Sequence, residues 1–179
     1  GEDDRMNHLA IVRIVSAIAL GYSVLLAICF LVALATGETT QLIVFAATAI
    51  AVGGLASTVI LLTDKPTRRA QARDGLAVAV LFWTVGGVIA AIPFVDYIGS
   101  ADFLAAMYES ISNLTTTGHS RLDTETNPLP ISIFVWRAML HLIGAVASIT
   151  IAATVFTSLN QGGPGEHRTR CFSAPEVRV

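Results

Sequence analysis

The sequence predicts an all-α membrane protein with four transmembrane helices, one re-entrant pore helix and a filter loop. Of its 179 residues, 54% are hydrophobic and 13% are charged, whereas a soluble domain carries roughly 25% charged residues. Four apolar runs are long enough to cross the hydrocarbon core of a bilayer, which needs about 20 helical residues. A fifth helical segment, between the third and fourth runs, is only about half that long.

The four apolar runs divide the chain into units. The predicted spans are Leu9–Ala35, Leu42–Leu62, Gly75–Val95 and Ile131–Leu159. The predicted units are an N-terminal segment (1–8), two leading transmembrane helices (9–62), a basic loop (63–74), a helix–pore loop–helix repeat (75–159) and a polar tail (160–179).

The basic residues predict the orientation of the chain in the membrane. The loop between the second and third spans carries four of them, Lys65, Arg68, Arg69 and Arg73, whereas Gly37–Gln41 carries none. Cytoplasmic loops are enriched in Lys and Arg. We therefore expect a multi-pass protein with the basic loop and both termini in the cytoplasm. The short segment between the third and fourth spans then faces outside.

The short segment Asp102–Asn113 reads as a helix of roughly 18 Å at 1.5 Å per residue. Ser100 and Asp102 are both candidate N-caps, because short polar side chains accept hydrogen bonds from the first free amides of a helix. A helix of this length reaches about half way across a bilayer. The alternative is an amphipathic helix on the membrane surface, followed by a polar loop.

Thr115, Thr116, Thr117 and Gly118 follow this segment. Three β-branched residues in a row disfavour helix, and glycine readily adopts a positive φ. We expect the helix to end near Leu114 and to lead into an extended strand of backbone carbonyls. Carbonyl oxygens replace the hydration shell of a cation in a selectivity filter. An ordinary Thr-rich extracellular turn is the alternative.

Several polar residues surround the predicted filter. The candidates for a role at the pore mouth or in support of the filter are His119, Glu109, Arg137 and His141. Charged residues within spanning helices usually face protein or water, and Glu109 is a candidate partner for Arg137. The alternatives are an exposed loop histidine at 119, an arginine that snorkels to the interface, and a packing histidine at 141.

Two acidic residues and several small residues are further candidates for a role in ion passage or helix packing. Asp123 and Glu125 either raise the local cation concentration outside or are solvated loop charges. Small residues spaced for close helix packing occur at Gly53 and Ser57, at Gly86-Gly87, and at Gly144 and Ser148.

One ordered set of motifs resembles the Trk/Ktr/HKT superfamily of potassium and sodium transporters, and most of all its bacterial TrkH branch. The motifs are Arg73-Asp74-Gly75, Trp83, Pro93-Phe94, Phe103, the run from Tyr108 to Gly118, Trp136-Arg137 and Ile143-Gly144. Members of that family have two leading helices and four helix–pore loop–helix repeats. The resemblance covers the leading helices and the first repeat, and it departs from the family at His119 and at Gly144-Ala145.

The resemblance implies potassium uptake across the bacterial inner membrane. Thr115–Gly118 would supply one of four filter segments, with K⁺ as the transported ion, Na⁺ as the alternative, and filter carbonyls as the metal ligands. The remaining segments would come from further copies or from a longer protein. The implied partners are membrane lipid and a cytoplasmic nucleotide-binding regulatory ring.

Two other classes of function are alternatives to transport. The first is a non-conducting accessory or scaffold subunit, bound to the unrelated subunits of a photosynthetic or respiratory assembly. The second, an enzyme, is not expected, because the sequence has no metal-ligand cluster, nucleophile elbow or paired carboxylates in an apolar run. Neither a cofactor nor nucleic acid is expected as a partner.

Overall fold

The chain folds into five helices in a computed structural model that describes residues 8–63, 72–99, 102–120, 122 and 128–161. The described helices are α1 (His8–Thr36), α2 (Thr39–Leu62), α3 (Ala72–Ile98), α4 (Phe103–Leu114) and α5 (Ile131–Gln161). No strand occurs in these ranges. Several predicted features lie outside the described residues, namely segment 1–7, most of the basic loop, Ser100, Asp123, Glu125 and nearly all of the polar tail.

The predicted fold class of four long apolar helices and one short helix is confirmed. Four of the described helices are long and apolar enough to cross a membrane, over Ile11–Thr36, Thr39–Leu62, Val78–Ile98 and Ile131–Ala153. Large apolar side chains such as Ile50, Leu61 and Ile149 lie exposed on them. A helix that is apolar on all sides is typical of a membrane span, and α3 continues beyond Pro93 to Ile98.

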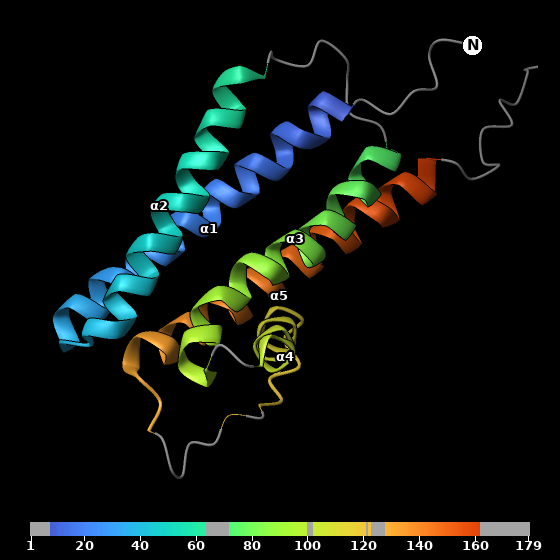
Figure 1. The fold of residues 1–179 in the computed structure, drawn as a ribbon. Coiled ribbons are helices and arrows are strands. Elements are labelled where there is room, and N and C mark those ends of the chain that lie inside the picture. The colour runs from blue at the N-terminus through green and yellow to red at the C-terminus, as the bar shows by residue number, and fades with distance from the viewer. Residues whose placement is uncertain (1–7, 64–71, 100–101, 121, 123–127, 162–179) are drawn as a thin grey trace, which may run out of the picture.

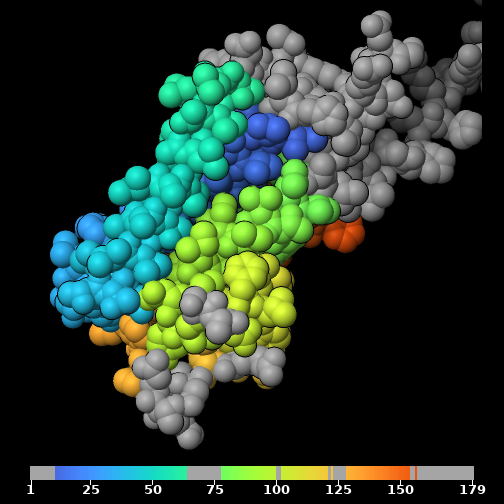
Figure 2. All heavy atoms as spheres, viewed as in Figure 1, coloured from blue at the N-terminus to red at the C-terminus, as the bar shows by residue number. Residues whose placement is uncertain are grey.

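The spanning helices form two antiparallel pairs (Figure 1). α1 packs along α2, and α3 lies beside α5. α1 also contacts both α3 and α5. The start of α1, the end of α2, the start of α3 and the end of α5 lie at one end of the bundle. The α1–α2 connection and the start of α5 lie at the opposite end. Figure 2 shows α4 against α3, on the side away from α2.

The buried core gathers where α4 meets the spans. Phe45, Phe94, Leu114, Trp136 and Leu140 are fully buried there. Trp136 donates through Nε1 to the Ala90 carbonyl at 3.1 Å and meets Phe45 edge-on at 6.1 Å between ring centroids. Buried tryptophans usually bind a polar partner in this way. These contacts link α2, α3 and α5.

Glycines on α2 and α3 lie against side chains of α1. A Cβ atom at Gly53 would lie 2.4 Å from Ser23 Oγ, and one at Gly86 would lie 2.6 Å from the Tyr22 hydroxyl. Both contacts are with the ends of side chains on α1, so a larger residue at either position would force the Ser23 or Tyr22 side chain to move. Close approach at small residues is the usual packing mode of membrane helices, which confirms the predicted packing surfaces at Gly53 and Gly86.

Glu38 joins the α1–α2 connection to the start of α5. Its carboxylate accepts hydrogen bonds from the Ile131 amide at 2.6 Å, from the Ser132 amide at 3.2 Å and from the Ser132 hydroxyl. These groups include free amides of the first helical turn, where negative charge is favoured. Partial burial acts to raise the pKa of Glu38, but the hydrogen bonds outweigh it and lower the pKa below its ordinary value.

Candidate functional site

The candidate site is built on α4, a helix of 12 residues that begins at Phe103. Asp102 is its N-cap, because Asp102 Oδ1 accepts a hydrogen bond from the Ala105 amide at 2.9 Å. This confirms one of the two predicted caps. The helix ends at Leu114, as the threonine run predicts, and its bounds are one residue later than expected.

The end of α4 lies about half way along two spanning helices. Ser110 Oγ donates to the Gly87 carbonyl of α3 at 2.6 Å. Gly87 is 11 residues before the end of α3 at Ile98, roughly 16 Å along the helix. On the other side Leu114 meets Gly144 of α5, which is 13 residues after Ile131, or about 20 Å.

The chain leaves α4 through a tight turn. Thr117 donates its amide to the Ser112 carbonyl at 3.0 Å, and Thr116 donates to the Asn113 carbonyl at 3.1 Å. This pair of bonds defines a Schellman motif, in which the donor of the shorter loop, here Thr116, adopts a left-handed conformation. Thr116 does so, with φ 60°. A β-branched residue rarely adopts this conformation. Thr115 has φ −84° and ψ 5°, so neither residue is extended, and the expectation of an extended strand is wrong at Thr115 and Thr116.

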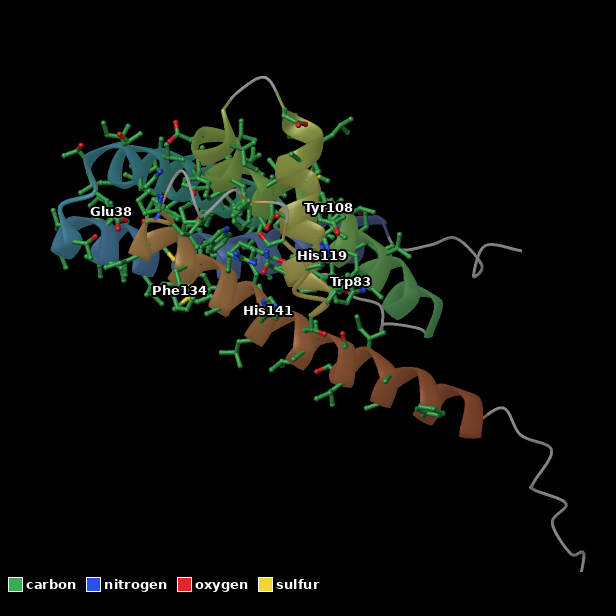
Figure 3. All side chains as sticks on the ribbon, turned by 90° about the horizontal axis from the view of Figure 1, so that it is seen from below. Glu38, Trp83, Tyr108, His119, Phe134 and His141 are labelled. Atoms are coloured by element: carbon green, nitrogen blue, oxygen red, sulfur yellow. The ribbon has the colours of Figure 1, made fainter. Side chains whose placement is uncertain are left out.

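Gly118 reverses the chain, which then returns along α4. Its φ of 72° confirms the positive φ predicted for this glycine. Ser112 Oγ donates to the His119 carbonyl at 2.6 Å, and His119 Nδ1 is 2.7 Å from the Tyr108 hydroxyl. Ser120 Oγ donates to both carboxylate oxygens of Glu109, at 3.0 and 3.1 Å. Figure 3 shows the His119 ring beside Tyr108, on the flank of α4.

The turn Thr115–Gly118 presents backbone carbonyls that have no partner among the described residues. Within the described part of the chain, the carbonyl oxygens of these residues accept no hydrogen bond. Their side chains are exposed, and the Thr115 and Thr117 hydroxyls lie 3.0 Å apart. The C-terminal end of a helix also carries a partial negative charge. The turn is therefore able to offer oxygen ligands to a cation.

Three of the predicted supporting residues, Glu109, Arg137 and His141, are linked by hydrogen bonds that connect the end of α4 to α5. Arg137 Nε donates to Asn113 Oδ1 at 3.3 Å, and Asn113 Nδ2 donates to the Glu109 carbonyl at 2.6 Å. The guanidinium thus bonds to Asn113 rather than to Glu109, whose carboxylate binds Ser120. His141 Nδ1 is 3.1 Å from the Arg137 carbonyl.

His141 also reaches the turn itself. A Cβ atom placed on Gly118 would be 3.1 Å from His141 Nε2, so this histidine on α5 packs directly against the glycine. The structure therefore brings His141 and Arg137 close to the turn from α5, and Glu109 and His119 from the α4 side.

Sequence reasoning missed two residues of this site, Ser112 and Asn113. Both are buried, and both use polar side chains to bind groups beyond their own turn of helix. The available signal was their position in the last helical turn. Polar side chains buried there need partners, and the free carbonyls and returning chain at a helix end supply them.

These features define a class: a membrane protein in which a half-length helix and a carbonyl-presenting turn lie between two spanning helices. No family model matches the chain. The sequence is 33% identical over 102 residues to the Trk system potassium uptake protein TrkG of Escherichia coli, covering 56% of this chain and 21% of that protein.

Two further relatives extend this similarity. The chain is 34% identical over 110 residues to the TrkH protein of Halomonas elongata, covering 58% of this chain and 22% of the relative. It is 35% identical over 80 residues to an uncharacterized cation transporter of Methanocaldococcus jannaschii, covering 45% and 17%. The predicted resemblance is thus confirmed: the chain is related to Trk potassium uptake proteins over about half its length. It spans about a fifth of the length of these relatives.

Proposed function

We propose that the chain supplies one segment of the selectivity filter of a potassium uptake protein. The observation that carries this proposal is the turn Thr115–Gly118, which begins half way along α3 and α5 and whose carbonyls accept no hydrogen bond from the residues that the structure describes. The relatives are potassium uptake proteins by name. α4 is then a re-entrant pore helix, since non-helical backbone at membrane depth is tolerated where it lines a watery cavity.

In this mechanism the protein replaces the water around the ion. A K⁺ ion entering from outside exchanges hydration oxygens for the carbonyls of Thr115, Thr116, Thr117 and Gly118. The negative end of the α4 dipole stabilises the ion at that depth. One turn surrounds only part of an ion, so further copies of the chain or further repeats of a longer protein supply the other segments. Those segments jointly determine the preference for K⁺ over Na⁺.

The proposal includes an orientation and a set of partners. The end of the bundle that holds the starts of α1 and α3 faces the cytoplasm, because the basic loop connects there. The start of α5 and the return segment face outside, where ions enter. A cytoplasmic nucleotide-binding ring would then regulate passage from the opposite end.

The proposal is tested by substituting Gly118 in the chromosomal gene of the cell that makes the protein. Gly118 has a positive φ and packs against His141, so Gly118→Asp should abolish rubidium uptake and growth at low potassium. Gly37→Ala is the matched control, because Gly37 has a similar φ of 76° and no atom within 4 Å of an added Cβ. Unchanged uptake in Gly118→Asp would overturn the proposal.

A second measurement distinguishes transport from a scaffold role. Native mass spectrometry of the chain, extracted gently from its own membrane, gives the stoichiometry and the partners. Four copies, or a partner with three further repeats, would complete a pore. A single copy among unrelated subunits would instead favour the scaffold reading.

A further inference from the structure

Ser112 holds the candidate turn through both its carbonyl and its hydroxyl. Its carbonyl accepts hydrogen bonds from the amides of Thr117 at 3.0 Å and Gly118 at 3.1 Å. Its hydroxyl donates to the carbonyl of His119 at 2.6 Å. Ser112 is 7% exposed, so water competes poorly for these bonds. One residue therefore fixes both the end of the turn and the first residue after it.

This arrangement separates His119 from the four residues before it. The His119 carbonyl is occupied by the Ser112 hydroxyl, whereas those of Thr115–Gly118 accept no hydrogen bond within the described chain. The His119 ring is held on the same side by the Tyr108 hydroxyl. Both the backbone and the side chain of His119 are thus directed to α4.

We propose that Ser112 is a positioning residue that ends the coordinating stretch at Gly118 and fixes the orientation of the turn. This inference rests on the proposed function. Selectivity among cations depends on the number and field strength of the coordinating carbonyls. Release of the His119 carbonyl would add an oxygen at the outer end and loosen the four before it, which reduces discrimination between K⁺ and Na⁺.

Ser110 is a matched control on the same helix. It is also buried, and its hydroxyl donates at the same distance, 2.6 Å, but to Gly87 of α3. Ser110→Ala therefore removes an equally short bond without touching the turn. Ser112→Thr retains a hydroxyl and should restore what Ser112→Ala removes.

The first experiment measures amide hydrogen exchange on the complete chain in lipid nanodiscs and needs no ion flux. In Ser112→Ala, the amides of residues 115–120 should exchange roughly 3- to 10-fold faster, the factor expected for one hydrogen bond. Ser110→Ala and Ser112→Thr should keep the wild-type rate in this segment. Equal rates in Ser112→Ala and wild type, or equal acceleration in Ser110→Ala, would overturn the proposal.

The second experiment measures the ratio of rubidium to sodium uptake in cells with each variant in the chromosomal gene. A ratio is insensitive to the amount of folded protein, so a purely structural defect does not change it. The ratio should fall several-fold in Ser112→Ala and recover in Ser112→Thr. A wild-type ratio in Ser112→Ala would overturn the proposal. If the wild-type protein carries no rubidium, the proposed function fails, and hydrogen exchange alone decides the role of Ser112.

Discussion

The carbonyl oxygen of Leu114 lies directly against the α-carbon of Gly144. A Cβ atom at position 144 would come within 1.9 Å of this oxygen and 2.8 Å of the Leu114 carbonyl carbon. Both are backbone atoms, so no rotamer change can relieve the contact. The last residue of α4 therefore sits at its depth beside α5 only because residue 144 has no side chain.

Gly144→Ala should consequently destabilise the fold. Overpacking of a tight contact costs about 1–3 kcal/mol, and here the end of α4 must move away from α5. The free energy of unfolding in mixed detergent micelles measures this loss. Gly54→Ala is the control, because an added Cβ there has no atom within 4 Å and alanine favours helix by up to about 1 kcal/mol. Equal stability of the two variants would contradict the contact.

Thr116→Gly should stabilise the turn. Thr116 has a φ of 60°, and a left-handed conformation costs an L-residue about 1–2 kcal/mol, a cost from which glycine is exempt. We expect a gain of about 1 kcal/mol in the free energy of unfolding, reduced by the greater freedom of glycine in the unfolded chain. Thr117→Gly should give no gain, since Thr117 is not among the residues with positive φ. A loss of stability in Thr116→Gly would contradict the strain.

Asp102→Ala should weaken the start of α4. The side chain of Asp102 accepts the Ala105 amide, and loss of such a cap costs about 1 kcal/mol. Asp102→Ser, which retains an accepting oxygen, should recover most of this loss. Thermal unfolding of both variants provides the comparison. If the alanine variant were as stable as the serine variant, the cap would contribute nothing.

Glu38 should make stability depend on pH at the end of the bundle where the α1–α2 connection meets the start of α5. Its pKa is lowered in the folded protein, so its contribution is fully present above its ordinary value of about 4.3. The contribution is lost as the pH falls through the lowered folded value. Glu38→Gln removes the ionisable group. The difference in unfolding midpoint between wild type and Glu38→Gln should be constant above about pH 5.5 and shrink towards pH 3.

The control for this pH dependence is Asp102→Asn. This variant removes the carboxylate of Asp102 and leaves Glu38 in place. Its stability should therefore still include the Glu38 contribution and should still lose that contribution at low pH. A difference between wild type and Glu38→Gln that stays the same at all pH values would show that the Glu38 carboxylate is not the titrating group.

The sequence alone determined the local features of this protein. Long apolar runs identified the four spans because the hydrophobic thickness of a bilayer fixes the length of a helix that crosses it. The polar Asp102 predicted the start of α4, and the threonine run predicted its end. Capping and helix propensity act over three or four residues, so they can be read directly from the chain.

Only the tertiary structure decided what surrounds the end of α4. Ser112 meets His119 because the chain reverses at Gly118, and Leu114 meets Gly144, which lies 30 positions later in the sequence. The bond of Glu38 to Ser132 joins residues 94 apart. The left-handed conformation of Thr116 is disfavoured for a β-branched residue. Thr116 adopts it because the Schellman bonds and the packing of Leu114 on α5 together outweigh the local strain. Contacts of this kind depend on how complete helices pack, and no local pattern encodes them.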